Sequence, residues 1–345
     1  MYKIILSFLL SVNFITAQNI ESIFLDSGNE IPLLIFDKPS DIEDLLNQEV
    51  VKGQMFNFGK FVMCDISSSD DGLWTEIDGG KVWTLAIEAT NAKGISLYYD
   101  DFWIPSSGEL YIYNPSQTQR IGPFTSKHNH ISGLFATEII HGETLIIEYF
   151  QPEYENNDLK LSINRFAYGY RDISGGQLNG YNSSDECQVN ANCSEGNAWE
   201  NQKKSVCRIQ IGSGWNVGLC SGGLVNNTLN NCTPYVLSAD HCFSGGDISD
   251  NGLNQSIFYF NYRSTNCNNS VPTNTHSITG CSRVANSGGE GNNGDPDFFL
   301  VELNSDPDFD PYFAGWNRSN TGATSGVSIH HPSGDIMKIS TFTNT

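Results

Sequence analysis

Apolar and polar residues alternate along several short stretches in the first half of the chain. The clearest alternation covers residues 83–89 and 159–164. A period of two places successive side chains on opposite faces of a β-strand. Further apolar runs at 95–99, 110–113 and 145–150 are separated by segments containing Gly, Pro, Asn or Asp, which favour turns. This pattern predicts an antiparallel β-sandwich-like region.

One helical signal precedes these strands. Ser40 is followed three residues later by Glu43, ahead of Leu45 and Leu46. A Ser and a Glu at this spacing form a capping box, in which each side chain accepts a hydrogen bond from a backbone N–H at the start of a helix. We therefore predict a short helix that begins at Ser40.

The second half of the chain is also strand-like, with loops rich in Asn and Gly and no helical period of useful length. The expected strands lie at 208–211, 223–225, 235–237, 257–262, 298–303 and 327–329. Short strands joined by turns predict a β-barrel or a second sandwich, so the whole chain is expected to be all-β.

The cysteines divide the chain into two regions. Cys64 is the only cysteine between residues 19 and 180, whereas the other eight lie between 187 and 281. The intervening residues 174–180 are Ser, Gly and Asn-rich, which is typical of a flexible linker. We predict an N-terminal domain at 18–180 and a disulfide-stabilised domain at 181–345.

The first 17 residues have the pattern of a secretory signal peptide. Lys3 supplies a positive charge, residues 4–15 are mostly apolar, and Thr16 and Ala17 form a small-residue cleavage site. The alternative is a buried N-terminal strand or helix. Export to an oxidising compartment would make the cysteines candidates for disulfide bonds.

The composition excludes two classes of partner. The formal net charge of −21 excludes a nucleic-acid binder with a basic surface, because such proteins neutralise phosphates with clustered Lys and Arg. After the signal peptide, no apolar run approaches the ~20 residues of a membrane-spanning helix. With 39% hydrophobic residues, the chain can form a sizeable core instead.

The candidate chemistry lies at the ends of two expected strands. His241 follows the strand at 235–237, and the next residue, Cys242, can join this turn to the segment around Cys220. Asp297 directly precedes the strand at 298–303, and an acid there can be directed at an imidazole. A His followed by an Asp, with a nucleophile later in the chain, is the order of the chymotrypsin-type triad.

Other histidines admit a metal-binding interpretation. His128 and His130 are separated by one residue and could ligate a metal, although exposed loop histidines are the simpler reading. His330 and His331 are neighbours on a strand, so their side chains should point to opposite faces. We therefore assign no metal to the chain.

Six motifs follow one another in the second half of the chain: Cys-Gln-Val-Asn-Ala-Asn-Cys at 187–193, Cys-Ser-Gly-Gly-Leu-Val-Asn-Asn at 220–227, Ala-Asp-His-Cys at 239–242, Asp-Phe-Phe-Leu-Val-Glu-Leu at 297–303, Ala-Gly-Trp-Asn-Arg at 314–318, and Ile-His-His-Pro-Ser-Gly-Asp at 329–335 with Lys-Ile-Ser at 338–340. In these motifs and in their order, residues 187–340 resemble the trypsin-fold lysyl endopeptidases of bacteria and their relatives from the Bacteroidetes. The preceding region resembles the secreted propeptides found in front of such enzymes.

The resemblance assigns roles to individual residues. It implies that His241 is the general base and that Asp297, rather than Asp295 or Asp240, is the acid that orients it. It also implies disulfides between Cys220 and Cys242 and between Cys193 and Cys267. The family's third disulfide would join Cys187 to a later cysteine, but none follows Cys281. Cys64, Cys207, Cys232 and Cys281 receive no partner.

The family's nucleophile lies in a Gly-x-Ser-Gly-x-Pro-like loop, and nothing after Asp297 matches this pattern. We therefore expect a fragment that contains the first barrel and the start of the second, with the serine, oxyanion hole and specificity pocket beyond residue 345. Without its nucleophile, this fragment is expected to be inactive, because the loss of that residue lowers turnover about a millionfold.

The predicted function is that of a secreted serine endopeptidase precursor. Its substrates would be proteins or peptides, and the resemblance alone implies cleavage after lysine. No metal or organic cofactor is required, and the N-terminal region is expected to pack on the protease domain. The alternatives are a pseudoprotease that only binds and a surface adhesion or glycan-binding protein.

Overall fold

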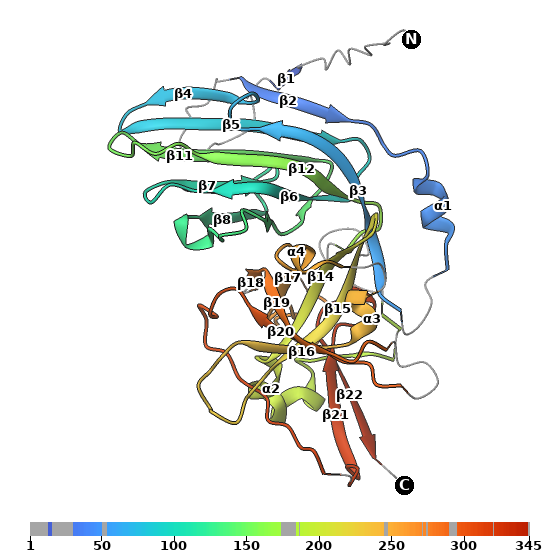
Figure 1. Ribbon diagram of the computed structural model, residues 1–345. Helices are drawn as coiled ribbons and strands as arrows, with labels where there is room; N and C mark the ends of the chain where they lie inside the picture. Colours follow the sequence, from blue (N-terminus) through green and yellow to red (C-terminus); the bar gives the residue numbers. More distant parts are fainter. Residues whose placement is uncertain are drawn as a thin grey trace, which may run out of the picture.

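The computed structural model describes residues 13–15, 30–49, 54–173, 184–185, 187–244, 248–270, 272–273, 275–289, 295–319 and 321–343. Strands account for 46% of the chain and the helices are short, which confirms the all-β prediction. Figure 1 shows a layered N-terminal part above a C-terminal part whose last two strands project away from both.

The N-terminal part consists of two sheets. Its elements are β1 (Asn13–Ile15), β2 (Ile31–Phe36), α1 (Ile42–Asn47), β3 (Phe56–Ser67), β4 (Leu73–Ile77), β5 (Gly80–Ala89), β6 (Gly94–Trp103), β7 (Glu109–Tyr113), β8 (Arg120–Phe124), η1 (Ser126–His128), β9 (Phe135–Ala136), β10 (Ile140–His141), β11 (Thr144–Pro152) and β12 (Lys160–Gly169). One sheet has the order β1-β2-β5-β11-β7-β8, with β4 also paired to β5. The facing strands run β10-β6-β12-β3, with β9 paired to β6.

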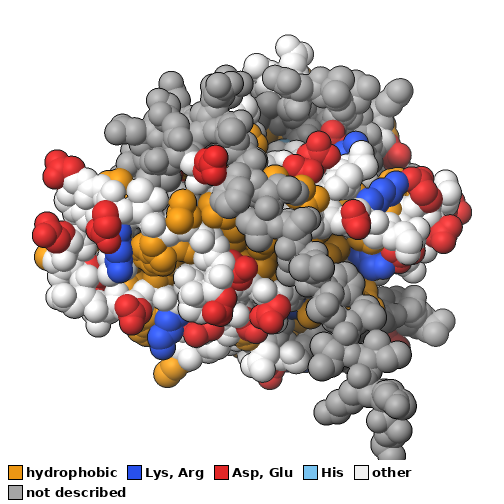
Figure 2. All heavy atoms as spheres, turned by 90° about the horizontal axis from the view of Figure 1, so that it is seen from above, with side chains coloured by type: hydrophobic (Ala, Val, Ile, Leu, Met, Phe, Trp, Pro, Cys, Tyr) orange, Lys and Arg blue, Asp and Glu red, His pale blue; other side chains and the backbone are white. Residues whose placement is uncertain are grey.

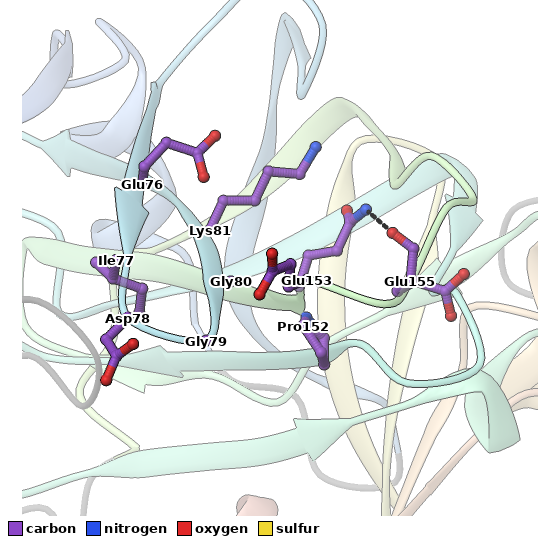
Figure 3. A pocket seen from close by; sticks show the side chains of 10 residues that line it. Glu76, Ile77, Asp78, Gly79, Gly80, Lys81, Pro152, Glu153 and Glu155 are labelled. Atoms are coloured by element: carbon purple, nitrogen blue, oxygen red, sulfur yellow. Dashed lines mark hydrogen bonds between the residues drawn. The ribbon is translucent and has the colours of Figure 1, made fainter.

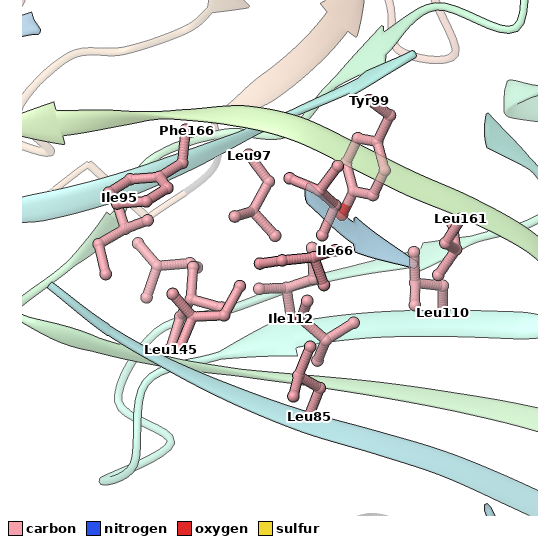
Figure 4. Close-up of a cluster of buried hydrophobic side chains, with 14 of the residues drawn as sticks. Ile66, Leu85, Ile95, Leu97, Tyr99, Leu110, Ile112, Leu145, Leu161 and Phe166 are labelled. Atoms are coloured by element: carbon pink, nitrogen blue, oxygen red, sulfur yellow. The ribbon is translucent and has the colours of Figure 1, made fainter. Parts of the chain in front are cut away.

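The core of this part lies between the two sheets. Leu85, Ile112 and Leu145 come from one sheet and meet Leu97 and Ile66 from the other, all of them buried (Figure 4). Apolar residues at alternate strand positions therefore interdigitate between two layers, as the period of two predicts. The sandwich expected for this region is present.

The outer face of the first sheet also carries apolar side chains. Ile31, Leu33, Tyr111 and Ile146 form a second buried cluster there, together with Ala86 of β5. Figure 2 shows hydrophobic side chains in the middle of this face and acidic side chains scattered around them. β5 is therefore buried on both of its faces, whereas alternation alone predicts only one apolar face.

The C-terminal part is built on a second run of paired strands. Its elements are β13 (Val189–Asn190), η2 (Ser194–Trp199), α2 (Glu200–Lys203), β14 (Val206–Ser213), β15 (Asn216–Val225), β16 (Tyr235–Ser238), α3 (Asp240–Ser244), α4 (Asp250–Leu253), β17 (Ile257–Phe260), β18 (His276–Thr279), β19 (Cys281–Asn286), β20 (Phe299–Leu303), β21 (Ser325–His330), η4 (Pro332–Gly334) and β22 (Lys338–Thr343). The main order is β18-β17-β14-β15-β16-β20-β19, and β13, β22 and β21 form a small third sheet.

Among the described strands, the barrel expected from the sequence is not closed by pairing. β18 and β19 lie at the two ends of the run and are separated along the chain only by Gly280. Gly280 has a φ of 90°, a conformation that glycine adopts without strain. At this glycine the chain passes from β18, which pairs with β17, to β19, which pairs with β20. Chain continuity, rather than a ladder of hydrogen bonds, therefore connects the two ends of the sheet.

The two parts share one sheet. β3 pairs with β12 and also with β15, where Lys60 lies opposite Asn216 and Phe56 opposite Leu219. Phe58 of β3 and Val217 of β15 belong to one buried apolar cluster that spans both parts. The sequence predicted two regions, but not this direct joining of their strands.

The helix near residue 42 is present, but its predicted cap is wrong. α1 begins after Asp41, whose side chain makes no capping hydrogen bond. Glu43 forms an ion pair with Lys38 rather than folding back to a backbone N–H. The Glu43 side chain, on which the capping box depends, therefore bonds to a lysine that precedes the helix.

Two predicted segments lie largely outside the described residues. The linker at 174–180 is one, and the expected signal peptide is the other, apart from Asn13–Ile15, which form β1 against β2. Among the described residues, no helix has both the length and the apolar character needed to cross a membrane.

Candidate active site

The pairing of β16 with β20 brings the candidate residues together. The strands are antiparallel, and Ser238 at the end of β16 lies opposite Phe299 at the start of β20. His241 follows the end of β16, whereas Asp297 precedes the start of β20. Both residues must therefore emerge at the same edge of the sheet.

His241 and Asp297 make a two-point contact. The Nδ1 atom of His241 lies 2.7 Å from Oδ2 of Asp297, and the backbone N–H of His241 donates to Oδ1 at 3.0 Å. Their side chains are 28% and 23% exposed, so the pair faces solvent on one side. A proton on Nδ1 satisfies the carboxylate and leaves Nε2 as the basic nitrogen.

The environment favours the charged form of Asp297. Burial alone would raise the pKa of its carboxyl group. The hydrogen bonds from the ring and backbone of His241 outweigh this effect, so the pKa of Asp297 lies below its usual value. Asp297 is thus a stable carboxylate acceptor for the imidazole.

A disulfide supports the turn that carries His241. Cys220 of β15 is bonded to Cys242, and a second disulfide joins Cys193 to Cys267. Both pairs are those that the resemblance implied. Cys220, His241 and Cys242 lie close enough to hold a metal ion. The two sulfur atoms are bonded to each other, however, so neither is a free thiolate ligand.

Residues 181–345 match the family model described as lysyl endopeptidase, C-terminal domain. The matched residues include His241, Asp297 and both disulfides. The match supports a peptidase of the lysyl endopeptidase type and, with it, protein substrates. The two disulfides are compatible with the extracellular location typical of lysyl endopeptidases.

The cysteines left without a predicted partner are free thiols in the structure. Cys187 and Cys232 are exposed, whereas Cys207 and Cys281 are buried, and all four lie in the region matched to the lysyl endopeptidase model. Burial raises the pKa of both buried thiols and raises that of Cys64 to about 12. These three groups are consequently poor nucleophiles at neutral pH.

Two of the remaining candidate histidines, His128 and His331, make structural contacts. His128 Nδ1 accepts from the backbone N–H of Thr125 in the turn at η1. His331 is buried, and its Nδ1 lies 2.9 Å from the carbonyl oxygen of Asp335. Burial lowers the pKa of His331 to about 3, so this ring is neutral at physiological pH.

Asp240 and Ser287 belong to the surroundings of the site, although sequence patterns did not single them out for it. The carboxylate of Asp240 is fully buried, and Ser287 Oγ lies 3.2 Å from its Oδ2. The sequence favours Asp297 over Asp240 as the orienting acid, and no motif surrounds Ser287. Only the tertiary contact reveals that they are connected.

A pocket of about 420 Å³ lies on different elements, between the β4–β5 turn and the end of β11 (Figure 3). Its lining includes Glu76, Asp78, Lys81 and Glu155. Ser106, Ser107 and Asn157 donate hydrogen bonds to Glu155, and those from Asn157 and Ser106 lower its pKa to about 2. In the described residues the pocket contains no paired base and nucleophile, so the proposed chemistry is assigned to the edge beside His241.

Proposed function

We propose that the chain is a secreted serine endopeptidase precursor in which His241 is the general base and Asp297 orients it. The observation that carries this proposal is the 2.7 Å contact between His241 Nδ1 and Asp297 Oδ2 within the region matched to the lysyl endopeptidase model. In this mechanism, Asp297 holds the tautomer with its proton on Nδ1. Nε2 then accepts the proton of a serine hydroxyl and later donates it to the leaving amine.

The nucleophile of this mechanism is assigned to residues outside those described. Among the described residues, Nε2 of His241 lies 3.6 Å from Sγ of Cys242, and no serine hydroxyl bonds to it. Ser221, on the neighbouring strand β15, accepts a hydrogen bond from the backbone of His331 instead. We therefore infer that the serine comes from a segment outside the described residues or from another molecule.

Reading the gene beyond codon 345 tests this assignment. A Gly-x-Ser-Gly-x-Pro codon run in frame would support the peptidase, and the encoded protein should react with a fluorophosphonate that labels activated serines. The variants Ser221→Ala and His241→Ala separate the outcomes: labelling should survive the first and disappear with the second. A different residue at the serine position would select the pseudoprotease instead.

The proposal also includes cleavage after lysine. The family description supports it, and the net charge of −21 is compatible with basic substrates. Peptides that differ only in Lys, Arg or norleucine before the scissile bond would test it. Equal kcat/KM values for Lys and norleucine would exclude recognition of the charge.

We also propose that residues 18–180 form a propeptide that stays packed on the peptidase region. The β3–β15 pairing supports this, as do the hydrogen bonds from Gln255 Nε2 to the carbonyl oxygen atoms of Tyr99 and Phe135. A protease site inserted between residues 173 and 184 would allow the chain to be cut in its folded state. The two pieces should co-elute in gel filtration, and their separation in native buffer would refute stable packing.

A further inference from the structure

Asp240 is a buried carboxylate at the first position of α3, immediately before the proposed general base. Its Oδ2 lies 3.2 Å from Ser287 Oγ, and Asn286 Nδ2 lies 3.3 Å from Oδ1. Asn286 ends β19, and Ser287 is the next residue. A buried carboxylate requires donors of this kind, because water cannot solvate it. The start of α3 is thus tied to the end of β19.

Ser287 makes a second connection, to the segment that carries Asp297. Its Oγ accepts from the backbone N–H of Phe298 at 3.1 Å, and its own N–H donates to the carbonyl oxygen of Phe298 at 2.9 Å. Phe298 directly follows Asp297. The single hydroxyl proton of Ser287 can go to Asp240 Oδ2 or to the carbonyl oxygen of Gly289 at 3.1 Å. The carboxylate is the stronger acceptor because the bond is charge-assisted.

These contacts form a closed circuit around the candidate dyad. Asp297 accepts from the backbone and ring of His241 in α3, and α3 is tied through Asp240 to Ser287. Ser287 in turn holds Phe298, the neighbour of Asp297. Pairing of β16 with β20 brings the two segments to one edge of the sheet. It does not fix the orientation of side chains that lie beyond the strand ends. The circuit restricts exactly those residues.

We propose that Asp240 and Ser287 are positioning residues that hold the carboxylate of Asp297 in register with Nδ1 of His241. This inference rests on the proposed function, because it concerns the same pair. Neither residue needs to touch substrate. Their effect is to keep the orienting acid and the base at bonding distance. The ring then keeps the orientation and the tautomer that catalysis requires.

The experiment observes the Nδ1–H proton of His241 by NMR in the full 345-residue chain labelled with 15N-histidine. It needs no peptidase activity. In the unmodified protein this proton should exchange slowly with solvent, since Asp297 holds it at 2.7 Å. Ser287→Ala and Asp240→Ala should accelerate its exchange about tenfold, the factor expected when one hydrogen bond to a charged group is lost. Asp240→Asn keeps an oxygen for Ser287 and should restore slow exchange.

Ser249→Ala is the matched control. Ser249 also accepts a backbone N–H through its Oγ, from Gly252 at 3.2 Å, but it caps α4 rather than bracing the dyad. In this variant, the Nδ1–H proton of His241 should exchange at a rate within about twofold of that in the unmodified protein. Equal effects of Ser249→Ala and Ser287→Ala would reduce the role of Ser287 to general stability and overturn the proposal.

Asp297→Asn separates this inference from the function on which it rests. If that variant leaves the His241 signal unchanged, the dyad itself is wrong. If Asp297→Asn abolishes slow exchange while Ser287→Ala and Asp240→Ala preserve it, the dyad stands and the positioning role is refuted. Should Asp240→Ala fail to fold, Ser287→Ala decides, because it removes only one oxygen atom from a half-buried position.

Discussion

Replacement of Gln210 by methionine should disrupt a buried polar cluster between the two parts of the chain. Gln210 lies on β14 and is fully buried. Its Nε2 donates to Ser96 Oγ at 2.9 Å and to Tyr98 Oη at 3.2 Å, both on β6 of the N-terminal part. Its Oε1 accepts from Tyr259 Oη at 2.9 Å. One side chain thus links β6, β14 and β17.

The expected loss in the free energy of unfolding follows from the groups that lose the Gln210 amide as a hydrogen-bond partner. Ser96 keeps a hydrogen bond to the carbonyl oxygen of Thr137 at 2.7 Å, so its loss is small. The hydroxyl groups of Tyr98 and Tyr259 remain buried and lose the amide, although Ser96 still bonds to the first and the backbone of Ile139 to the second. At about 1–3 kcal/mol for a lost buried hydrogen-bond partner, Gln210→Met should lower the free energy of unfolding by about 1–3 kcal/mol. That is a large share of the ~5–15 kcal/mol typical of folded proteins.

Urea unfolding, followed by tryptophan fluorescence and far-UV circular dichroism, measures this change. The triple variant Gln210→Met, Tyr98→Phe, Tyr259→Phe removes the hydroxyl groups as well as the amide, so it should recover most of the loss. A single variant within about 0.5 kcal/mol of the unmodified protein would refute the reasoning, as would a triple variant less stable than the single one. Because one sheet crosses both parts, both probes should report one transition.

Three further outcomes are expected. Replacement of Cys193 and Cys267 by alanine should lower the free energy of unfolding by about 4 kcal/mol, measured in urea, because the disulfide closes a loop with a sequence separation of 74 residues; an unchanged midpoint would contradict this. The pKa of His331 is about 3 in the folded state, so as the pH falls His331 becomes protonated in the unfolded chain before it does so in the folded one. Protonation therefore favours unfolding, and the melting temperature should fall as the pH decreases below about 6.5. His331→Gln should flatten that dependence, and an equal slope in both proteins would exclude His331 as its source. The carboxyl 13C signal of Asp297 should report a pKa below the usual aspartate range, and this pKa should rise in His241→Ala, because the ring stabilises the charged form. An unchanged pKa in that variant would refute this electrostatic coupling.

Individual strands could be predicted from the sequence because the alternation of apolar and polar residues involves only neighbours along the chain. The stretch predicted at 83–89 lies within β5, and the run at 145–150 lies within β11. The pattern did not reveal that Thr84 of β5 is buried as completely as Trp83. The burial of a strand's second face depends on what covers that face, which residues in the strand itself do not encode.

The candidate site was only partly accessible from sequence. Motifs with known spacing singled out His241 and Asp297, and the structure brings them to 2.7 Å. The surrounding circuit through Asp240 and Ser287 has no sequence signature, because its members come from separate segments. Neither residue type is unusual at a loop or helix start, so nothing marked Ser287 before its contacts were known.

The amino-acid sequence by itself determined the all-β character, the uneven distribution of the cysteines and the residues able to carry acid–base chemistry. These properties depend on residue type and short-range spacing, which remain the same in the unfolded chain. Only the tertiary structure decided that β3 joins β15, that the sheet ends at Gly280 without a closing ladder, and that Ser287 reaches Asp240. Such contacts form between distant segments, and they depend on how whole surfaces pack rather than on any one stretch of chain.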